Sequence, residues 1–388
     1  MQLPVYMDYN ATTPVDERVL AAMLPFFTIH FGNAASSNHE YGWYAAEAVK
    51  IAREQIAALI HAEPGEIIFT SGATEAINLA IKGVYEIYAA KGNHIITCVT
   101  EHRAVLDTCS YLEKKGARIT YLPVDDGGNI NLHELERSIA PDTILIALMY
   151  ANNETGVIYP VSEIGAIAKK HGVLFFCDAT QAAGKIPVHV QDDNIDIMCM
   201  SAHKMYGPKG AGALYVRRRN PRVTLAAQIH GGGHEKGLRS GTLNVPGIAG
   251  LGKACDLMMS ELHDEMKRIR KMRDEFEHAL LSRKAIFSNV LNNSRLPNVI
   301  NICFRGADKN ALHTALGKKV AFSAGSACTS AKPEPSHVLK AMGLSNEDAG
   351  NSVRLSIGRF TKEEDITFAT NEILNIAGTL IPANDSVI

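Results

Sequence analysis

The chain has 388 residues, of which 46% are hydrophobic and 21% are charged, and its formal net charge at pH 7 is −2. A chain of this length and composition is expected to bury a full core and to form roughly two or three domains. Binding of nucleic acid or of an acidic membrane surface usually requires a net positive charge, which this chain lacks, so neither is expected as a partner.

Three local features of the sequence indicate in which cellular compartment the protein is expected. The longest apolar run, residues 144–151, is too short to cross a bilayer and is typical of a buried strand. Residues 1–14 lack the basic and apolar regions of a signal peptide. The seven cysteines form no CxxC pair and no even framework, which favours a reducing, cytoplasmic location.

Short apolar runs alternate with helix-like stretches between about residue 65 and residue 216. The runs cover residues 67–70, 95–99, 144–150, 173–177, 195–200 and 213–216. The first four are almost continuously apolar, as strands buried on both faces must be. Amphipathic stretches at residues 132–139 and 161–171 lie between them. This alternation predicts an α/β domain with a mostly parallel sheet flanked by helices.

The pattern changes beyond residue 255. Residues 257–282 form a long charged segment with apolar positions at helical spacing, which we expect to lead out of the first domain. Short strands are then expected at residues 299–304, 320–322 and 352–357, among helices. We therefore predict a large domain at residues 16–258. The smaller α+β domain is predicted at residues 259–388, together with residues 1–15.

Functional side chains follow four of the predicted strands. In an open parallel sheet, ligands bind beyond the carboxyl ends of the strands. A lone His, Asn or Lys at such a place is usually a turn residue or solvated. Asp178 is harder to dismiss, because a carboxylate that ends a buried strand needs a cationic or multi-donor partner. The strands end in Glu101-His102, Asn152-Asn153, Asp178 to Gln181, and Ser201 to Lys204.

Pyridoxal 5′-phosphate (PLP) accounts for this set of side chains. Asp178 pairs with the protonated pyridine nitrogen, and Lys204 forms the Schiff base. The phosphate lies at residues 71–74, where small residues and hydroxyls open a helix, with help from Ser201 and His203. Asp178 and Lys204 are 204 − 178 = 26 residues apart, enough for one strand–helix–strand unit that brings both into one crevice.

The cysteines divide into two kinds. Six lie in apolar strand-like or helix-like segments and are expected to be core residues with inert thiols. Cys328 lies instead in the small-residue run at residues 323–331, where a loop can expose a reactive thiol. The expected core cysteines are Cys98, Cys109, Cys177, Cys199, Cys255 and Cys303.

Two further segments are notable. Residues 231–242 are rich in glycine but contain no G-x-G-x-x-G, so a dinucleotide loop is excluded. Too little of this segment is apolar for burial in its own domain, and we expect it to reach a partner subunit. Arg354 lies inside an apolar alternation, where it is either a structural ion pair or a clamp for a substrate carboxylate.

Taken in order, these motifs resemble the NifS/IscS-type cysteine desulfurases, which are class V aminotransferase-like, fold-type I PLP enzymes. The resemblance runs almost from end to end. It rests on DYNATTP (8–14), TSGATE (70–75), TEH (100–102), NNETG (152–156), DATQ (178–181), SAHKMYG (201–207), RSGT (239–242), SACTS (326–330) and RLSIGRF (354–360).

The resemblance implies a cysteine desulfurase that converts L-cysteine to L-alanine and supplies the sulfur for iron–sulfur cluster or other thio-cofactor assembly. Lys204 holds the cofactor and moves the Cα proton, His102 stacks on the ring and serves as acid/base, and Cys328 takes the sulfur as a persulfide. The remaining implied residues bind cofactor or substrate. For the cofactor they are Ala73, Thr74, Asn153, Asp178, Gln181, Ser201, His203 and, from the other subunit of a homodimer, Thr242. For the substrate they are Asn153, Arg354 and Asn10.

The partner expected from the resemblance is a sulfur-acceptor protein. Housekeeping members of the family use a longer C-terminal tail to dock an iron–sulfur scaffold protein, whereas here 388 − 360 = 28 residues follow Phe360. Three alternatives remain: a selenocysteine lyase, a class V aminotransferase, which has no need of Cys328, and a non-catalytic relative that keeps only the fold. Retention of both Lys204 and Cys328 disfavours the last of these. No metal ligand set is predicted.

Overall fold

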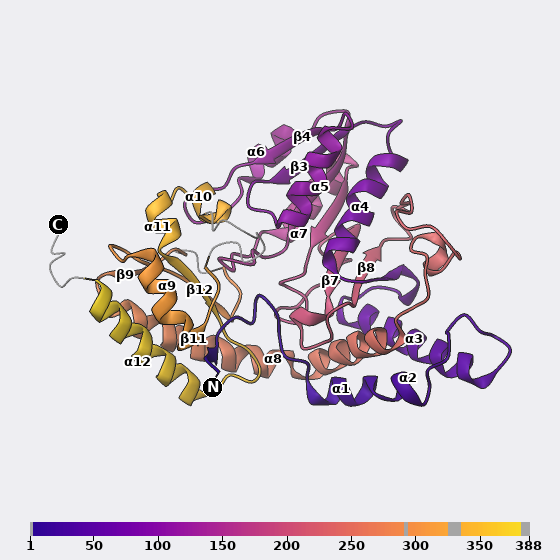
Figure 1. The fold of residues 1–388 in the computed structure, drawn as a ribbon. Coiled ribbons are helices and arrows are strands. Elements are labelled where there is room, and N and C mark those ends of the chain that lie inside the picture. Colours follow the sequence, from indigo (N-terminus) through magenta and orange to yellow (C-terminus); the bar gives the residue numbers. More distant parts are fainter. Residues whose placement is uncertain (1–2, 291–293, 325–334, 382–388) are drawn as a thin grey trace.

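The computed structural model describes residues 3–290, 294–324 and 335–381. A seven-stranded sheet forms the larger part of the molecule, in the order β2-β8-β7-β6-β5-β3-β4 (Figure 1). Strands β3 to β7 pair in parallel, and β8 runs antiparallel to both of its neighbours. The predicted mostly parallel α/β architecture is confirmed. Its strands are β2 (Ile67–Thr70), β3 (His94–Cys98), β4 (Arg118–Leu122), β5 (Thr143–Met149), β6 (Leu174–Asp178), β7 (Ile197–Ser201) and β8 (Gly212–Val216).

Helices cover both faces of this sheet, which explains why its central strands are apolar throughout. Ile96 and Ile146 contribute to one core, and their neighbours Ile95 and Leu145 to the core on the opposite face. The first face is covered by α3 (Glu40–Leu59), α6 (Leu132–Ser138), α7 (Val161–His171) and the first half of α8 (Val245–Leu281). The second is covered by α4 (Ala73–Ile87) and α5 (Arg103–Glu113).

A smaller three-stranded sheet, in the order β12-β10-β9, lies at the other end of α8. The N-terminal segment joins it, since Met7 is buried in its core and β1 (Val5–Tyr6) pairs with β11 (Val320–Ala321). This arrangement agrees with the predicted α+β part, and the boundary at residue 258 remains a prediction that falls within α8. The other elements here are β9 (Ile286–Ser288), β10 (Val299–Phe304), α9 (Lys309–Gly317), α10 (His337–Ala341), α11 (Asn346–Gly350), β12 (Ser352–Ser356) and α12 (Glu363–Leu380).

The long helix α8 begins earlier than its charge pattern predicted. The structure extends it to Val245, and the Asn244 side chain caps it by accepting a hydrogen bond from the Gly247 amide at 3.2 Å. Glycines obscure the helical pattern in this first part. Gly252 is needed there for close packing, because a Cβ at this position would lie 2.5 Å from the Cα of Ala52 in α3.

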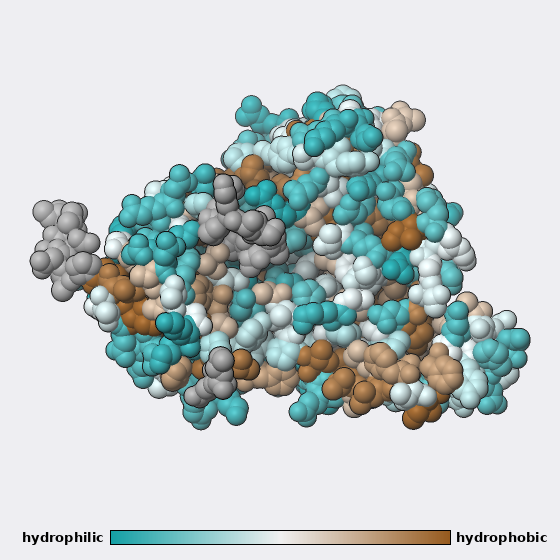
Figure 2. Space-filling model, in the orientation of Figure 1, coloured by the Kyte–Doolittle hydropathy of each residue, from teal (hydrophilic) through white to brown (hydrophobic). Residues whose placement is uncertain are grey.

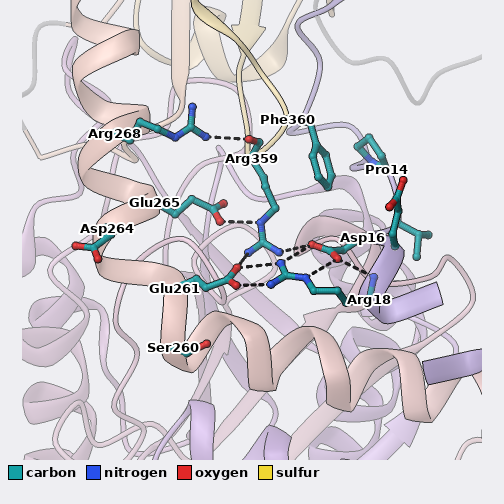
Figure 3. Close-up of a pocket in the computed structure, with 12 residues that line it drawn as sticks. Pro14, Asp16, Arg18, Ser260, Glu261, Asp264, Glu265, Arg268, Arg359 and Phe360 are labelled. Atoms are coloured by element: carbon teal, nitrogen blue, oxygen red, sulfur yellow. Dashed lines mark hydrogen bonds and ion pairs between the residues drawn. The ribbon is translucent and has the colours of Figure 1, made fainter. Parts of the chain in front are cut away.

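Charged side chains join α8 to the segment that follows β12 (Figure 3). Arg359 donates to Asp16 at 2.6 Å and to Glu265 at 2.7 Å, and Arg18 donates to Asp16 at 2.8 Å. Hydrogen bonds from Arg18 and Arg359 hold the pKa of the Asp16 carboxyl well below its usual range. These residues line a cavity of about 940 Å³. Because the charged side chains that line it already pair with one another, we interpret this cavity as a structural contact between α8 and the segment that follows β12.

Among the described residues, no helix combines the length and the apolar character that crossing a membrane requires.

Candidate active site

The carboxyl ends of β5, β6 and β7 are aligned at one edge of the sheet. Asp178 is the last residue of β6, and in register it lies beside Met149 of β5 and Cys199 of β7. Its side chain is buried, and Oδ1 accepts hydrogen bonds from the Thr180 amide at 3.0 Å and from the Cys199 thiol at 3.2 Å. Asp178 therefore presents a fixed carboxylate at the edge where ligands of parallel sheets bind.

His102 lies close to this carboxylate. It caps α5, where Nδ1 accepts a hydrogen bond from the Ala104 amide at 3.1 Å, so that in the neutral ring Nε2 carries the proton. Burial lowers the pKa of His102. The negative charge of Asp178 opposes this shift, and the positive charge of Lys204 adds to it. The three side chains thus interact electrostatically, and the imidazole is neutral at neutral pH.

Lys204 ends the short 3₁₀ turn Ala202–Lys204 that follows β7. Its amine donates to the carbonyl oxygen of Asn10 at 2.6 Å and to that of Ala11 at 2.7 Å. Both acceptors belong to the N-terminal segment, so this segment, which packs with the small sheet, directly contacts the edge of the large sheet.

Asn10 and Arg354 connect the two sheets through the backbone of Asn153. The Asn153 carbonyl accepts from Asn10 Nδ2 at 3.1 Å and from Arg354 Nη1 at 3.0 Å. Arg354 also forms an ion pair with Asp8, with 2.7 Å between Nη2 and Oδ1. The sequence left open a structural ion pair or a substrate clamp, and the ion pair is present. However, Nε of Arg354 is buried and has no hydrogen-bond partner among the described residues, which leaves a donor for a carboxylate ligand.

The N-terminus of α4 lies beside the end of β7. Gly72 precedes the helix with φ 153°, a conformation that favours glycine, and no side chain caps the first turn. A Cβ at Gly72 would lie 3.7 Å from Ser201 Oγ, so the two residues are close. Ala73 is half-buried and Thr74 exposed. Free backbone N–H groups beside a serine hydroxyl suit a phosphate.

His203 lies in the 3₁₀ turn Ala202–Lys204, directly before Lys204. Its Nδ1 is 3.1 Å from the Thr12 hydroxyl. Burial, and then the positive charge of Lys204, lowers the pKa of His203 to about 4. It is therefore a neutral hydrogen-bonding group at neutral pH rather than a cation.

The described residues at this edge of the sheet match the groups that PLP needs. A helix terminus without a side-chain cap, a buried carboxylate and a lysine amine are the three groups that PLP requires. Gln181 is part of the same network, because its Nε2 donates to the Asn10 carbonyl at 3.0 Å. In the described part of the chain, no group of three His, Cys, Asp or Glu side chains is arranged to hold a metal ion.

Of the predicted site residues that the structure describes, Thr242 is not brought into this network. Thr242 is exposed, at the end of the glycine-rich segment, which is anchored by the ion pair between Glu235 and Arg53 at 2.7 Å. Cys328 lies outside the described residues. The six cysteines expected in the core are all buried, as predicted. Burial raises the pKa of each thiol, for Cys109, Cys255 and Cys303 to about 12.

The sequence did not single out Lys185 or Asn298, yet both contact the site. Lys185 Nζ lies 3.0 Å from Asn10 Oδ1, and Asn298 Nδ2 lies 2.9 Å from the same oxygen. Both side chains are buried. The one available signal was the position of Lys185 four residues after Gln181, where a helical turn brings the two side chains together.

Comparisons with known proteins agree with this geometry. Residues 5–368 match the family model described as aminotransferase class-V. The chain is 52% identical over 369 residues to a protein named cysteine desulfurase IscS from Anaeromyxobacter sp. (strain Fw109-5), covering 94% of this chain and 90% of that one. A solved structure titled NifS-like protein has a TM-score of 0.90 and 38% identity, covering 97% of this chain and 100% of that chain. Another, titled SspA in complex with cysteine, has a TM-score of 0.82 and 38% identity, covering 92% and 99%.

Proposed function

We propose that this chain, which belongs to the aminotransferase class-V family, acts as a PLP-dependent cysteine desulfurase. It converts L-cysteine to L-alanine and retains the sulfur as a persulfide on Cys328. One observation carries the proposal: Asp178, His102 and Lys204 end or follow β6, β3 and β7 of one sheet, beside a helix terminus without a side-chain cap. The similarity to a protein named cysteine desulfurase supports the choice of reaction within the family.

The residues of the sheet edge would hold the cofactor. Asp178 pairs with its ring nitrogen, Gln181 donates to its phenolic oxygen, and Lys204 binds it covalently. Ala73, Thr74, Ser201 and His203 bind its phosphate, with Thr242 supplied by the partner subunit. When bound, the cofactor supplies an electron-withdrawing ring that weakens the bonds around the substrate Cα.

The protein's own side chains orient the substrate and move its protons. Arg354, through its unpaired Nε, and Asn153 bind the α-carboxylate, with Asn10 beside them. The amine of Lys204 takes the Cα proton, and His102, which is neutral, accepts or returns protons near the ring. The Cys328 thiolate then attacks the substrate Sγ. The new S–S bond forms as the Cβ–Sγ bond breaks, and its electron pair remains with carbon, which takes a proton to give alanine.

The sulfur on Cys328 needs an acceptor. We propose a sulfur-acceptor protein that serves iron–sulfur cluster or other thio-cofactor assembly, in the cytoplasm. The relatives named IscS support this partner class. Cysteine and selenocysteine differ only in the atom that would be transferred to Cys328.

The function is tested by the visible absorption of the purified protein. We expect a yellow protein after reconstitution with PLP, a change of the spectrum on addition of L-cysteine, and formation of alanine. Protein without added cysteine is the control. A reconstituted protein that remains colourless contradicts the proposal. A coloured protein that transfers the amino group of cysteine without releasing alanine belongs with the aminotransferases instead.

Exposed apolar side chains at residues 24–31, which follow α1 (Glu17–Met23) and include α2 (Pro25–Thr28), and on α3 support a homodimer. Figure 2 shows apolar residues gathered along the lower edge of the molecule, over α1 and α2. Contiguous exposed apolar surface of this kind marks an interaction site. The exposed residues and their exposed fractions are Leu24 (55%), Phe27 (57%), Ile29 (63%), Phe31 (63%), Trp43 (55%) and Tyr44 (54%). In the segment at residues 231–242, Glu235 and Ser240 are buried, but residues 231–233 and 241–242 are exposed and are then available to reach the partner's site.

We expect the wild-type protein to sediment as a dimer and Phe27→Asp with Trp43→Asp to sediment as a monomer. Charges on an apolar interface oppose association because each must lose its water. The monomer should bind PLP more weakly, since Thr242 of the partner subunit is lost from the phosphate. Exposed Phe368, on α12, offers a matched control, and Phe368→Asp should stay dimeric. A fully active wild-type monomer would exclude the role of Thr242.

Replacing Arg354 with lysine is expected to raise the KM for L-cysteine while the protein stays yellow. Lysine keeps a cation near Asp8 but loses Nε and the planar fork that binds a carboxylate. Loss of one partner of a charge-assisted pair in a dry site costs about 2–5 kcal/mol. Steady-state kinetics with both variants, Arg354→Lys and Arg354→Ala, measure this effect. An unchanged KM would assign the carboxylate to another residue.

A further inference from the structure

Lys185 is a buried lysine that the proposed reaction does not use. Its side chain is 5% exposed, and its amine donates to two neutral amide oxygens, Oδ1 of Asn10 at 3.0 Å and Oε1 of Gln181. Burial, reinforced by the positive charges of Lys204 and Arg354, holds the pKa of Lys185 well below its usual range. Charged or neutral, the amine has at least two N–H donors, enough for the two oxygens that it contacts.

The contacts around Lys185 fix the orientation of two amide side chains. An amide can turn by half a rotation with little change of shape, so its neighbours decide which end points where. Gln181 directs Nε2 to the Asn10 carbonyl, and Asn10 directs Nδ2 to the Asn153 carbonyl. Backbone carbonyls only accept hydrogen bonds. The oxygen ends of both amides must therefore face a donor. Lys185 is the donor that they share, and Asn298 Nδ2 is a second donor to Asn10 Oδ1 at 2.9 Å.

The carbonyl of Asn10 connects this arrangement to the cofactor lysine. That oxygen accepts hydrogen bonds from Gln181 Nε2 at 3.0 Å and from Lys204 Nζ at 2.6 Å. We propose that Lys185 is a positioning residue, which holds Gln181 and Asn10 so that Gln181 presents an N–H donor to the cofactor and Asn10 presents its carbonyl to Lys204. This inference rests on the proposed function, because it assigns Gln181 to the phenolic oxygen of PLP.

The test compares Lys185→Met with the wild-type holoenzyme. Methionine fills a similar volume but donates no hydrogen bond, so both amide oxygens lose their shared donor. We expect the dissociation constant for PLP to rise about tenfold, corresponding to the loss of roughly one orienting interaction. The visible absorption maximum should also shift, because the phenolic oxygen loses its donor. The control Lys253→Met changes a lysine that pairs with Asp256 on α8, and it should alter neither measurement.

A double-mutant cycle with Gln181→Leu separates positioning from general packing. If Lys185 orients Gln181, Lys185→Met should shift the absorption maximum in wild type but not in the Gln181→Leu background, where the phenolic oxygen has no amide donor left to lose. Independent effects of the two changes would overturn the inference. If Lys185→Met does not fold, Lys185→Gln replaces it in the cycle, since its amide can still donate to one oxygen.

The two proposals fail in different ways. A wild-type protein that binds no PLP removes the proposed function and this inference together. A wild-type protein that binds PLP and turns over cysteine, with Lys185→Met unchanged in affinity and spectrum, overturns the inference alone.

Discussion

Lys204→Ala is expected to abolish cysteine turnover and to leave the protein without covalently held cofactor. The amine serves twice in the proposed reaction, since it binds PLP and takes the Cα proton. Loss of a positioned acid–base group alone typically costs about 10²–10⁴-fold in rate. We therefore expect at least a roughly 10³-fold fall in alanine formation. Borohydride treatment should fix PLP to the peptide that contains Lys204 in wild type and to no peptide in the variant.

The matched control is Lys209→Ala, which removes an exposed lysine five residues further along the chain. It should retain colour, borohydride labelling and activity. PLP can still bind non-covalently to Lys204→Ala, because Asp178 and the α4 terminus remain. A borohydride label on a lysine other than Lys204, or wild-type turnover by Lys204→Ala, would refute the assignment.

Much of the sheet could be predicted from the sequence because buried parallel strands are apolar throughout. The expected strands at residues 67–70 and 299–304 coincide with β2 and β10. The helix expected at residues 161–171 is the observed α7, which ends where Gly172 adopts φ 64°. Strand β4 was missed, since it lies at the edge of the sheet and most of its side chains are only partly buried.

The location of the site was predictable for a related reason. Parallel strands bring their carboxyl ends to one edge, so residues that follow different strands become neighbours. Asp178, His102 and Lys204 end or follow β6, β3 and β7 of this sheet, and their roles at one site remain a prediction. Lys185 could not be found in the same way, because a lone lysine is usually solvated. Its partners, Asn10 and Gln181, lie 171 residues apart in the chain and meet only in the folded protein.

Cys328→Ser is expected to eliminate persulfide formation while the protein stays yellow and its spectrum still responds to L-cysteine. The six other cysteines are buried thiols with raised pKa values, so none of them is suited to attack a substrate. A serine hydroxyl is a far weaker nucleophile toward sulfur, and alanine formation from cysteine should fall by roughly 10³-fold or more. Mass spectrometry after a brief pulse of cysteine without reductant should find one added sulfur on the wild-type peptide that contains Cys328.

Cys255→Ala removes a buried thiol on α8 and serves as the control, with persulfide formation expected at the wild-type level. Selenocysteine provides a second comparison. Selenium leaves carbon more readily than sulfur, so Cys328→Ser should cleave selenocysteine better than cysteine if the nucleophile is needed only for the harder bond. Production of alanine from cysteine by Cys328→Ser at the wild-type rate would show that Cys328 is not the nucleophile. The protein would then belong with the lyases or aminotransferases of its family, because only a desulfurase needs a cysteine to receive the sulfur atom.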